Sequence, residues 1–238
     1  MSKIIRLVEG EMVRLYKNKI LPVSLFVTLL WIFIIAFSTR EEIQGLLPAI
    51  LVIDSAMLSI IYLAAAFYLE RQEGAIKSLF VSPLTSKEII ISKIISTIIT
   101  SLISTIVIIL TFLLVHKAEV NLFLLIVYTI LIVFTHSAIG FVIVLNCRDF
   151  AQMLGLYAAY AILFFLPTVF FLLQIIPDSW EVLLLASPTH SSMLLLQSAI
   201  LEAELLFELV AFFYLLILGL SLFIFYVKNK FKEYSVLG

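Results

Sequence analysis

Charged residues are scarce in this chain. Only 13% of its 238 residues are Asp, Glu, Lys or Arg, whereas 63% are hydrophobic. An average soluble domain carries about 25% charged residues. The composition therefore excludes a soluble globule and predicts a polytopic membrane protein. The formal net charge of −1 offers no excess of basic groups, so no nucleic-acid partner is expected.

Cysteine, glycine and histidine are also few. The single cysteine, Cys147, excludes a disulfide within the chain. The seven glycines are too widely spaced for the phosphate loop G-x-x-x-x-G-K-[ST], and no G-x-S-x-G elbow is present. The three histidines lack the spacing of metal ligands. We therefore expect no catalytic residues, no metal and no cofactor in this chain, and any ATP that is used must be bound by another chain.

Long apolar runs are abundant. A transmembrane helix needs roughly 20 largely apolar residues. We predict an all-α fold, a single transmembrane domain over residues 1–238, in which Pro167 kinks the fifth span. The six predicted spans are 20–38, 47–69, 89–115, 121–145, 152–176 and 205–227.

The first 19 residues form a separate amphipathic pattern. Their apolar residues lie on one side of a helical wheel, and most of their cations lie on the other. This pattern predicts an interfacial helix on the membrane surface over residues 1–19. A plain soluble N-terminal helix is the alternative. The apolar side is made of Ile4, Ile5, Val8, Met12, Leu15 and Tyr16.

The interval 177–204 is apolar only in pieces. Two short apolar stretches are separated by Ser187-Pro188-Thr189-His190-Ser191-Ser192, and neither is long enough to span a membrane. Ser187 as the N-cap, with Pro188 at the first helical position, predicts the start of a second short helix. We therefore expect two short extracellular helices that dip into the outer leaflet or lie on it.

The positions of the cations predict the orientation. With six spans and a cytoplasmic N-terminus, 13 of the 15 Lys and Arg residues fall on the cytoplasmic side, and only Arg40 and Lys117 fall outside. Cytoplasmic loops are enriched in Lys and Arg. Both termini of this multi-pass protein are therefore predicted to be cytoplasmic.

The longest charged interval, residues 68–93, reads YLERQEGAIKSLFVSPLTSKEIIISK. Gly74 favours a break in the helix, and Pro83 stops the segment that follows. Between them Ile76, Leu79 and Phe80 recur at helical spacing, which predicts a short amphipathic helix over residues 74–83. Thr85-x-x-Glu88 then forms a capping box that starts a new helix. A short amphipathic helix at the cytosolic end of a membrane bundle is suited to bind a soluble partner protein.

This interval also carries a resemblance to a known family. Glu70-Arg71-Gln72-Glu73-Gly74, the LFVSPLTSKE of residues 79–88, and Lys93 resemble the signature of type-2 ABC exporter permeases. The similarity is greatest to the short drug-export permeases of the fluoroquinolone-exporter kind. The local match covers roughly a ninth of the chain, and the layout of apolar segments extends it over the whole length.

The resemblance implies a function and partners. It implies a permease subunit in a prokaryotic cell membrane that exports amphiphilic drugs, peptides or lipids. It pairs with itself or with a related permease, and it is driven by separate ABC ATPase subunits that hold ATP and Mg²⁺. The short helix at 74–83 becomes a coupling helix. The residues expected to couple to the ATPase are Glu70, Arg71, Glu73, Gly74, Ile76, Leu79, Phe80 and Pro83.

A substrate path between the two permeases is expected to be lined by the second and fifth spans. Asp54 is the only carboxylate clearly inside a predicted span, and ionisable groups in membranes are candidates for function. It can also be structural, bonded to a neighbouring helix or to lipid headgroups, and the aromatic residues can be ordinary packing residues. The candidates for the path are Asp54, Tyr62, Tyr157, Tyr160 and Phe164.

Two other classes of protein remain open at this point. A secondary transporter would respond to an ion gradient, but the chain has no internal repeat of the kind many such transporters show. A membrane scaffold or immunity protein could use the same fold without an ATPase. Neither alternative accounts for the amphipathic segment at 74–83 as well as an ATPase-driven permease does.

Overall fold

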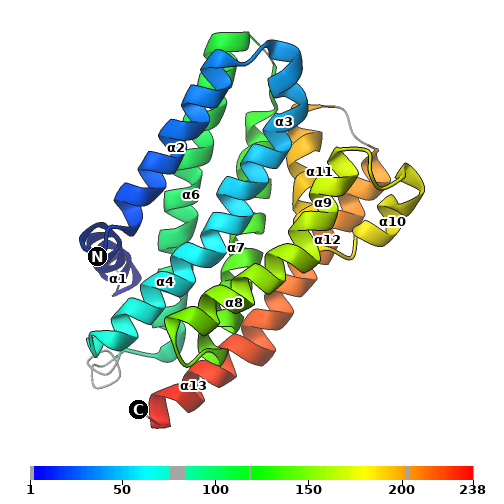
Figure 1. Cartoon of the computed structure of the whole chain (residues 1–238). Helices are drawn as coiled ribbons and strands as arrows, with labels where there is room; N and C mark the ends of the chain where they lie inside the picture. The colour runs from blue at the N-terminus through cyan, green and yellow to red at the C-terminus, as the bar shows by residue number, and fades with distance from the viewer. Residues whose placement is uncertain (1–2, 76–83, 118, 202–203, 238) are drawn as a thin grey trace.

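The computed structural model describes residues 3–75, 84–117, 119–201 and 204–237, and all regular structure within them is helical (Figure 1). Six of these helices are long and apolar enough to cross a membrane, which confirms the predicted number of spans. The six extend over Ile20–Phe37, Arg40–Gln72, Ser86–His116, Leu122–Asn146, Phe150–Leu172 and Leu205–Glu233.

Several of these helices are divided into labelled parts. In chain order the elements are α1 (Lys3–Lys17), α2 (Ile20–Phe37), α3 (Arg40–Val52), η1 (Ile53–Met57), α4 (Leu58–Gln72), α6 (Ser86–His116), α7 (Leu122–Asn146), α8 (Phe150–Tyr160), η2 (Ala161–Phe165), α9 (Leu166–Leu172), η3 (Asp178–Trp180), α10 (Glu181–Leu184), α11 (Pro188–Ile200), α12 (Leu205–Ser221), η4 (Leu222–Val227) and α13 (Lys228–Leu237). The elements η1, η2 and η4 are wide π-helical turns within longer helices. Such turns interrupt the regular ladder of hydrogen bonds and are frequent at functional sites.

The second span begins earlier than predicted. The sequence predicted a start at residue 47, where the apolar run begins. Instead α3 starts at Arg40, where the Thr39 side chain accepts from the Glu42 backbone N–H and the Glu42 carboxylate accepts from the Thr39 backbone N–H. This capping box satisfies two otherwise unpaired donors and starts the helix about two turns before the apolar run.

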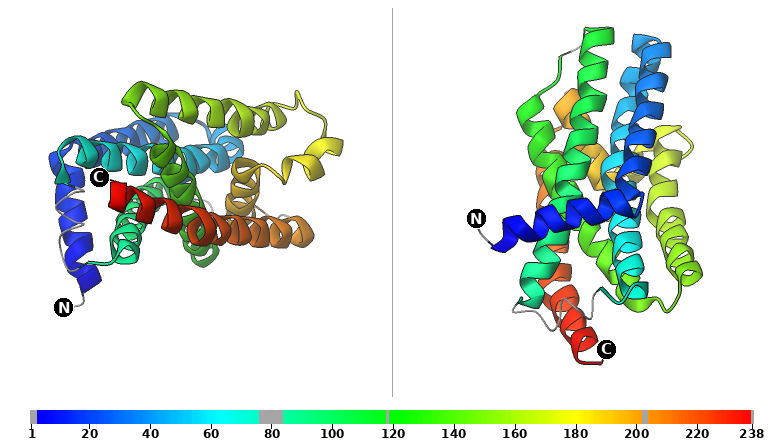
Figure 2. Two further views of the ribbon diagram at one scale, coloured as in Figure 1. Left: turned by 90° about the horizontal axis from the view of Figure 1, so that it is seen from below. Right: turned by 90° about the vertical axis from the view of Figure 1, so that its left-hand side faces the viewer.

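The first helix runs across the bundle. In the right-hand view of Figure 2, α1 lies nearly perpendicular to the long helices. Leu15 and Glu11 are buried against the bundle, whereas Ile5 and Tyr16 remain exposed. The predicted helix is therefore present over Lys3–Lys17, but its buried face includes an acid that the helical wheel did not single out.

The interval 177–204 holds two short α-helices, as predicted, and the second of them is buried. α11 starts with Pro188 at its first turn, and it packs against α12, α3 and α7. Eleven of its thirteen residues are buried against these neighbouring helices, and its placement in or on the outer leaflet stays a prediction. The Ser187 side chain does not cap the helix; its hydroxyl donates to the Phe164 carbonyl instead.

The centre of the bundle is α7, which packs on α4, α6, α11 and α12 (Figure 2, left). A close approach to α4 is possible because residue 140 is glycine: a Cβ there would lie 3.0 Å from the Ile60 carbonyl oxygen. The fifth span, α8 to α9, is the least covered, with 11% of its apolar window buried, whereas the second span is 72% buried.

The two ends of the bundle carry different segments. The end of α4, the α7–α8 connection and α13 lie toward the bottom of Figure 1, whereas the α2–α3 connection and the α6–α7 connection lie at the top. This separation agrees with the predicted alternation of the spans. We call the lower end the Gly74 end.

Candidate functional site

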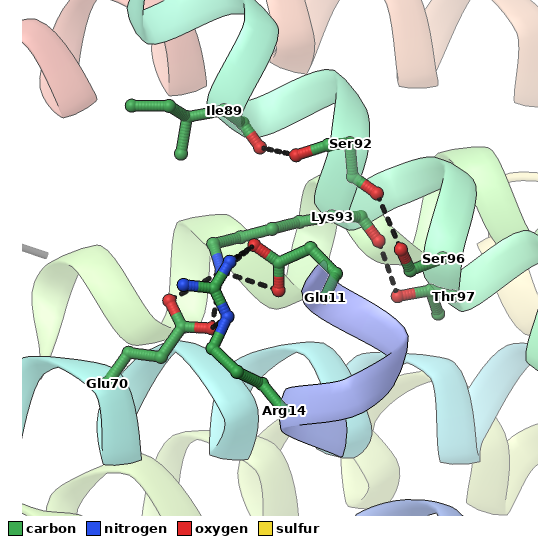
Figure 3. Close-up of polar contacts among 8 residues, drawn as sticks. All are labelled: Glu11, Arg14, Glu70, Ile89, Ser92, Lys93, Ser96 and Thr97. Carbon is green, nitrogen blue, oxygen red and sulfur yellow. Dashed lines mark hydrogen bonds and ion pairs between the residues drawn. The ribbon is translucent and has the colours of Figure 1, made fainter. Parts of the chain in front are cut away.

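A buried cluster of four charged side chains lies where α1, α4 and α6 meet (Figure 3). Lys93 is at its centre. Its Nζ donates to both carboxylate oxygens of Glu11, at 2.9 and 3.0 Å, and to both of Glu70, at 2.7 and 2.5 Å. Arg14 completes the cluster, with a terminal nitrogen 2.7 Å from Glu11 Oε1 and Nε 3.6 Å from Glu70 Oε1. We call these four residues the charge cluster.

Local sequence sets up this arrangement. Glu11 and Arg14 are three residues apart on α1, which places them on the same face of the helix. Glu70 is in the last turn of α4, and Lys93 is two turns into α6 after the Thr85–Glu88 capping box, which is present as predicted. Lys93 is thereby held in reach of Glu11 on α1 and Glu70 on α4, two helices that are far apart in the sequence.

The charge cluster is nearly closed to solvent and is electrically balanced. Glu70, Glu11 and Lys93 are 1%, 3% and 4% exposed, and Arg14 is partly exposed. Two carboxylates face two cations, so each buried charge is compensated. Removal of one member of such a buried set leaves an uncompensated charge and costs about 3–5 kcal/mol, although the intact set adds little net stability over apolar residues. The cluster therefore fixes how the three helices are joined.

Arg71, the next residue along α4, makes a second junction. One terminal nitrogen donates to the Cys147 carbonyl at 2.9 Å, and the other donates to the Arg148 carbonyl. Its guanidinium also lies over the Tyr68 ring, 5.1 Å from the centroid. Glu70 and Arg71 thus attach the end of α4 to α6 and α1 on one side and to the α7–α8 connection on the other.

Cys147, in that connection, is buried, and its thiol donates to the Val144 carbonyl. Burial raises the pKa of the Cys147 thiol above its ordinary value, although the neighbouring Arg71 acts in the opposite direction. A thiol with less thiolate is less reactive.

The rest of the predicted coupling segment is only partly described. Gly74 has φ of +70°, so the break after α4 uses the left-handed backbone that glycine adopts readily. Glu73 precedes it as an exposed residue of the turn. Ile76, Leu79, Phe80 and Pro83 lie outside the described residues, and the coupling helix at 74–83 stays a prediction.

The structure divides the predicted substrate-path residues into two places. Asp54 lies in η1, 4% exposed, and its Oδ1 accepts from the Ser104 hydroxyl of α6 at 2.8 Å. Tyr62 lies near it, and both line the same small cavity. Tyr160 instead packs in the fifth span on Phe164, with ring centroids 5.1 Å apart, and on His136 of α7. A role in transport stays a prediction for all of these residues, including the half-buried Tyr157.

The hydroxyl residues of α6 bond mostly within their own helix. Ser96, Thr97 and Thr100 each donate to the carbonyl four residues earlier. Ser104 is different, because it bonds to Asp54 of η1 and to Thr28 of α2. Thr100 also contacts Met12 Sδ of α1 at 3.9 Å, so among these four residues the contacts to other helices are made by Thr100 and Ser104.

Sequence reasoning did not find Glu11 and Arg14, and it noted Lys93 only as part of a motif. The one available signal was an acid on the apolar face of the α1 pattern, at i−4 from Leu15. Its partner Lys93 is 82 residues away, and neither helix carries a sequence pattern that predicts the pairing.

Comparison with known protein families gives a match to the model of the ABC-2 type transporter over residues 2–201. This chain belongs to the ABC-2 type transporter family. Its six apolar helices are then those of a multi-pass membrane permease. The match covers both junctions at the end of α4, and it does not single out the fluoroquinolone-exporter branch. A search of curated proteins found no match.

Proposed function

We propose that this ABC-2 permease is the membrane subunit of an ATP-driven exporter that moves amphiphilic compounds outward. A separate ATPase would dock at residues 74–83 and would supply both ATP hydrolysis and the bound Mg²⁺. The single observation that carries the proposal is the charge cluster, because it joins α4 to α1 and α6 directly beside the segment where the ATPase would act.

The mechanism follows from these contacts. A push on residues 74–83 reaches both the end of α4 and the start of α6, since the segment connects them in sequence. The Lys93–Glu70 pair holds these two helix ends together, and Glu11 ties α1 to both. The three helices would therefore tilt as a unit, which is one way to alternate access to a path through the membrane.

A pair of permeases is part of the proposal. The fifth span is the least covered of the six, and its exposed apolar side chains include Ile162, Leu163 and Phe170. A second permease, identical or related, would pack there, and the path would run beside the second and fifth spans. Without that partner, the same surface would contact lipid.

The proposed orientation places the Gly74 end in the cytoplasm of a prokaryotic cell, where an ATPase can reach it. Thirteen of the 15 cations fall on that side. A cysteine introduced at Lys87 should resist an impermeant thiol reagent on intact cells, and one at Lys117 should react. Reaction at 87 with protection at 117 would reverse the orientation.

The partner is tested by purifying the tagged permease from its native membranes into nanodiscs. The expected result is a co-purified ATPase whose hydrolysis rate rises when amphiphilic amines or peptides are added. A permease that transports such compounds with an ion gradient and no ATPase would be a secondary transporter. A permease with neither activity would be a scaffold, and either result would contradict the proposal.

A further inference from the structure

A groove of about 520 Å³ opens between α1, α2 and α6, and its described lining includes no member of the charge cluster. Its volume is within the range of ligand sites, roughly 300–1,000 Å³. Its walls are mostly apolar, and Leu25, Leu29 and Ile103 are exposed at its mouth, where the acyl chains of a bilayer would lie. The lining residues are Met12, Leu21, Ser24, Leu25, Thr28, Leu29, Ile32, Thr100, Ile103, Ser104 and Val107.

The floor of this groove is polar and leads to Asp54. Thr28 Oγ1 and Ser104 Oγ share a hydrogen bond of 2.7 Å, and the Ser104 hydroxyl donates to Asp54 Oδ1 at 2.8 Å. Since Thr28 and Ser104 both line the groove, the carboxylate is one hydroxyl away from it.

Behind the floor lies a small chamber of about 10 Å³, which has room for one water-sized group. All seven of its lining residues carry oxygen: Ser24, Asp54, Ser59, Tyr62, Thr97, Ser101 and Ser104. Within the described part of the chain, three buried atoms of these residues make no direct hydrogen bond: Asp54 Oδ2, Tyr62 Oη and Ser101 Oγ. The side chains of Trp31 and Ser24 lie close enough to act on the Asp54 carboxyl and the Tyr62 hydroxyl, respectively. Buried polar atoms are normally paired, so the chamber is built for an occupant that donates hydrogen bonds.

The charges specify that occupant further. Unlike Glu11 and Glu70, Asp54 makes no ion pair with any residue that the structure describes. A cationic group would compensate it. The described residues that line the groove include no Lys or Arg, so a phosphate beside the cation would have no partner.

We propose that the groove and chamber together bind a single-chain amphiphile with a primary ammonium group. The chain lies in the groove between α2 and α6, and the ammonium displaces the Thr28–Ser104 bond to reach Asp54 and the free hydroxyls. This site is open to the bilayer from the side, between α2 and α6, and its chamber shares Asp54 and Tyr62 with the path expected beside the second and fifth spans. Naming it as a substrate site rests on the proposed export, whereas binding itself needs no ATPase.

The test is equilibrium binding of tritiated dodecylamine and dodecanol to the purified permease in nanodiscs, with empty nanodiscs subtracted. At pH 7 the amine is protonated and the alcohol is neutral. The wild type should bind the amine about tenfold more tightly, and Asp54→Asn should abolish this preference while leaving alcohol binding within about twofold. Equal binding of the two compounds by the wild type, or a preference that survives in Asp54→Asn, would overturn the site.

A matched pair on α2 keeps the test decisive if Asp54→Asn does not fold. Leu29 lines the groove, and its exposed neighbour Leu30 does not. Leu29→Trp should fill the groove and weaken amine binding about fivefold or more, whereas Leu30→Trp should change it less than about twofold. Equal effects of the two substitutions, or effective competition by a phosphoethanolamine lipid, would contradict the assignment. Amine binding without any ATPase coupling would keep the site and contradict the exporter.

Discussion

A single lysine connects three helices in this permease. Lys93 Nζ contacts four carboxylate oxygens from two different helices, and Arg14 supports the same two acids from α1. Because the charge cluster is buried, water cannot replace the lost partner when one of its side chains is removed. The contacts of the charge cluster therefore hold α1, α4 and α6 together near the Gly74 end.

Lys93→Met should lower the free energy of unfolding by about 3–5 kcal/mol, because Glu70 and Glu11 then share only Arg14. Adding Glu70→Leu should recover part of that loss, since it removes one unpaired acid and leaves the Glu11–Arg14 pair. Unfolding of the single and double variants in detergent gives the interaction energy. The exposed Lys230–Glu233 pair is the control: Lys230→Met should cost at most about 1 kcal/mol. Equal costs for Lys93→Met and Lys230→Met would contradict the role of burial.

At the scale of elements, the number and type of helices could be predicted, and their ends only in part. Apolar length predicts six spans, and the Thr85–Glu88 capping box predicts the start of α6. The start of α3 was missed although Thr39 and Glu42 have the same spacing, because the span was bounded by its apolar run, which begins at residue 47. Burial of α11 could not be predicted either, because its 13 residues are too short to signal a place inside the bundle.

Gly140 sets the distance between α7 and α4. In Gly140→Ala the added Cβ would lie 3.0 Å from the Ile60 carbonyl oxygen, and this backbone atom cannot rotate away. We expect a loss of about 1–3 kcal/mol, as for other overpacked sites. Gly45→Ala in α3 is the control, because its Cβ would meet nothing within 4 Å, and the change should stabilise the helix by about 0.5–1 kcal/mol. Thermal unfolding of both variants in detergent compares them. A neutral or stabilising Gly140→Ala would show that the helices are not held at this distance.

In the whole molecule, the charge cluster and the Arg71 junction lie beside the segment that the sequence motif predicts to be functional, but the motif does not predict their contacts. Glu70 and Arg71 were predicted to couple to an ATPase, and the structure places Glu70 inside the bundle, 1% exposed, with Arg71 bonded to the α7–α8 connection. Both would therefore act by transmitting movement to neighbouring helices. The partners Glu11 and Lys93 are 82 residues apart, and only the folded bundle brings them together.

An ATPase is proposed to move this permease through residues 74–83, and the decisive measurement is substrate-stimulated ATP hydrolysis by the purified complex. Burying a side chain such as Leu79 or Phe80 in a cleft of the ATPase would contribute roughly 1.5–3 kcal/mol each. Leu79→Glu or Phe80→Glu should leave expression and membrane insertion normal and should abolish the stimulation. The control is Lys87→Ala, an exposed residue in the first turn of α6, which should retain it. Full substrate stimulation of ATP hydrolysis in both glutamate variants would show that the ATPase does not act through Leu79 and Phe80.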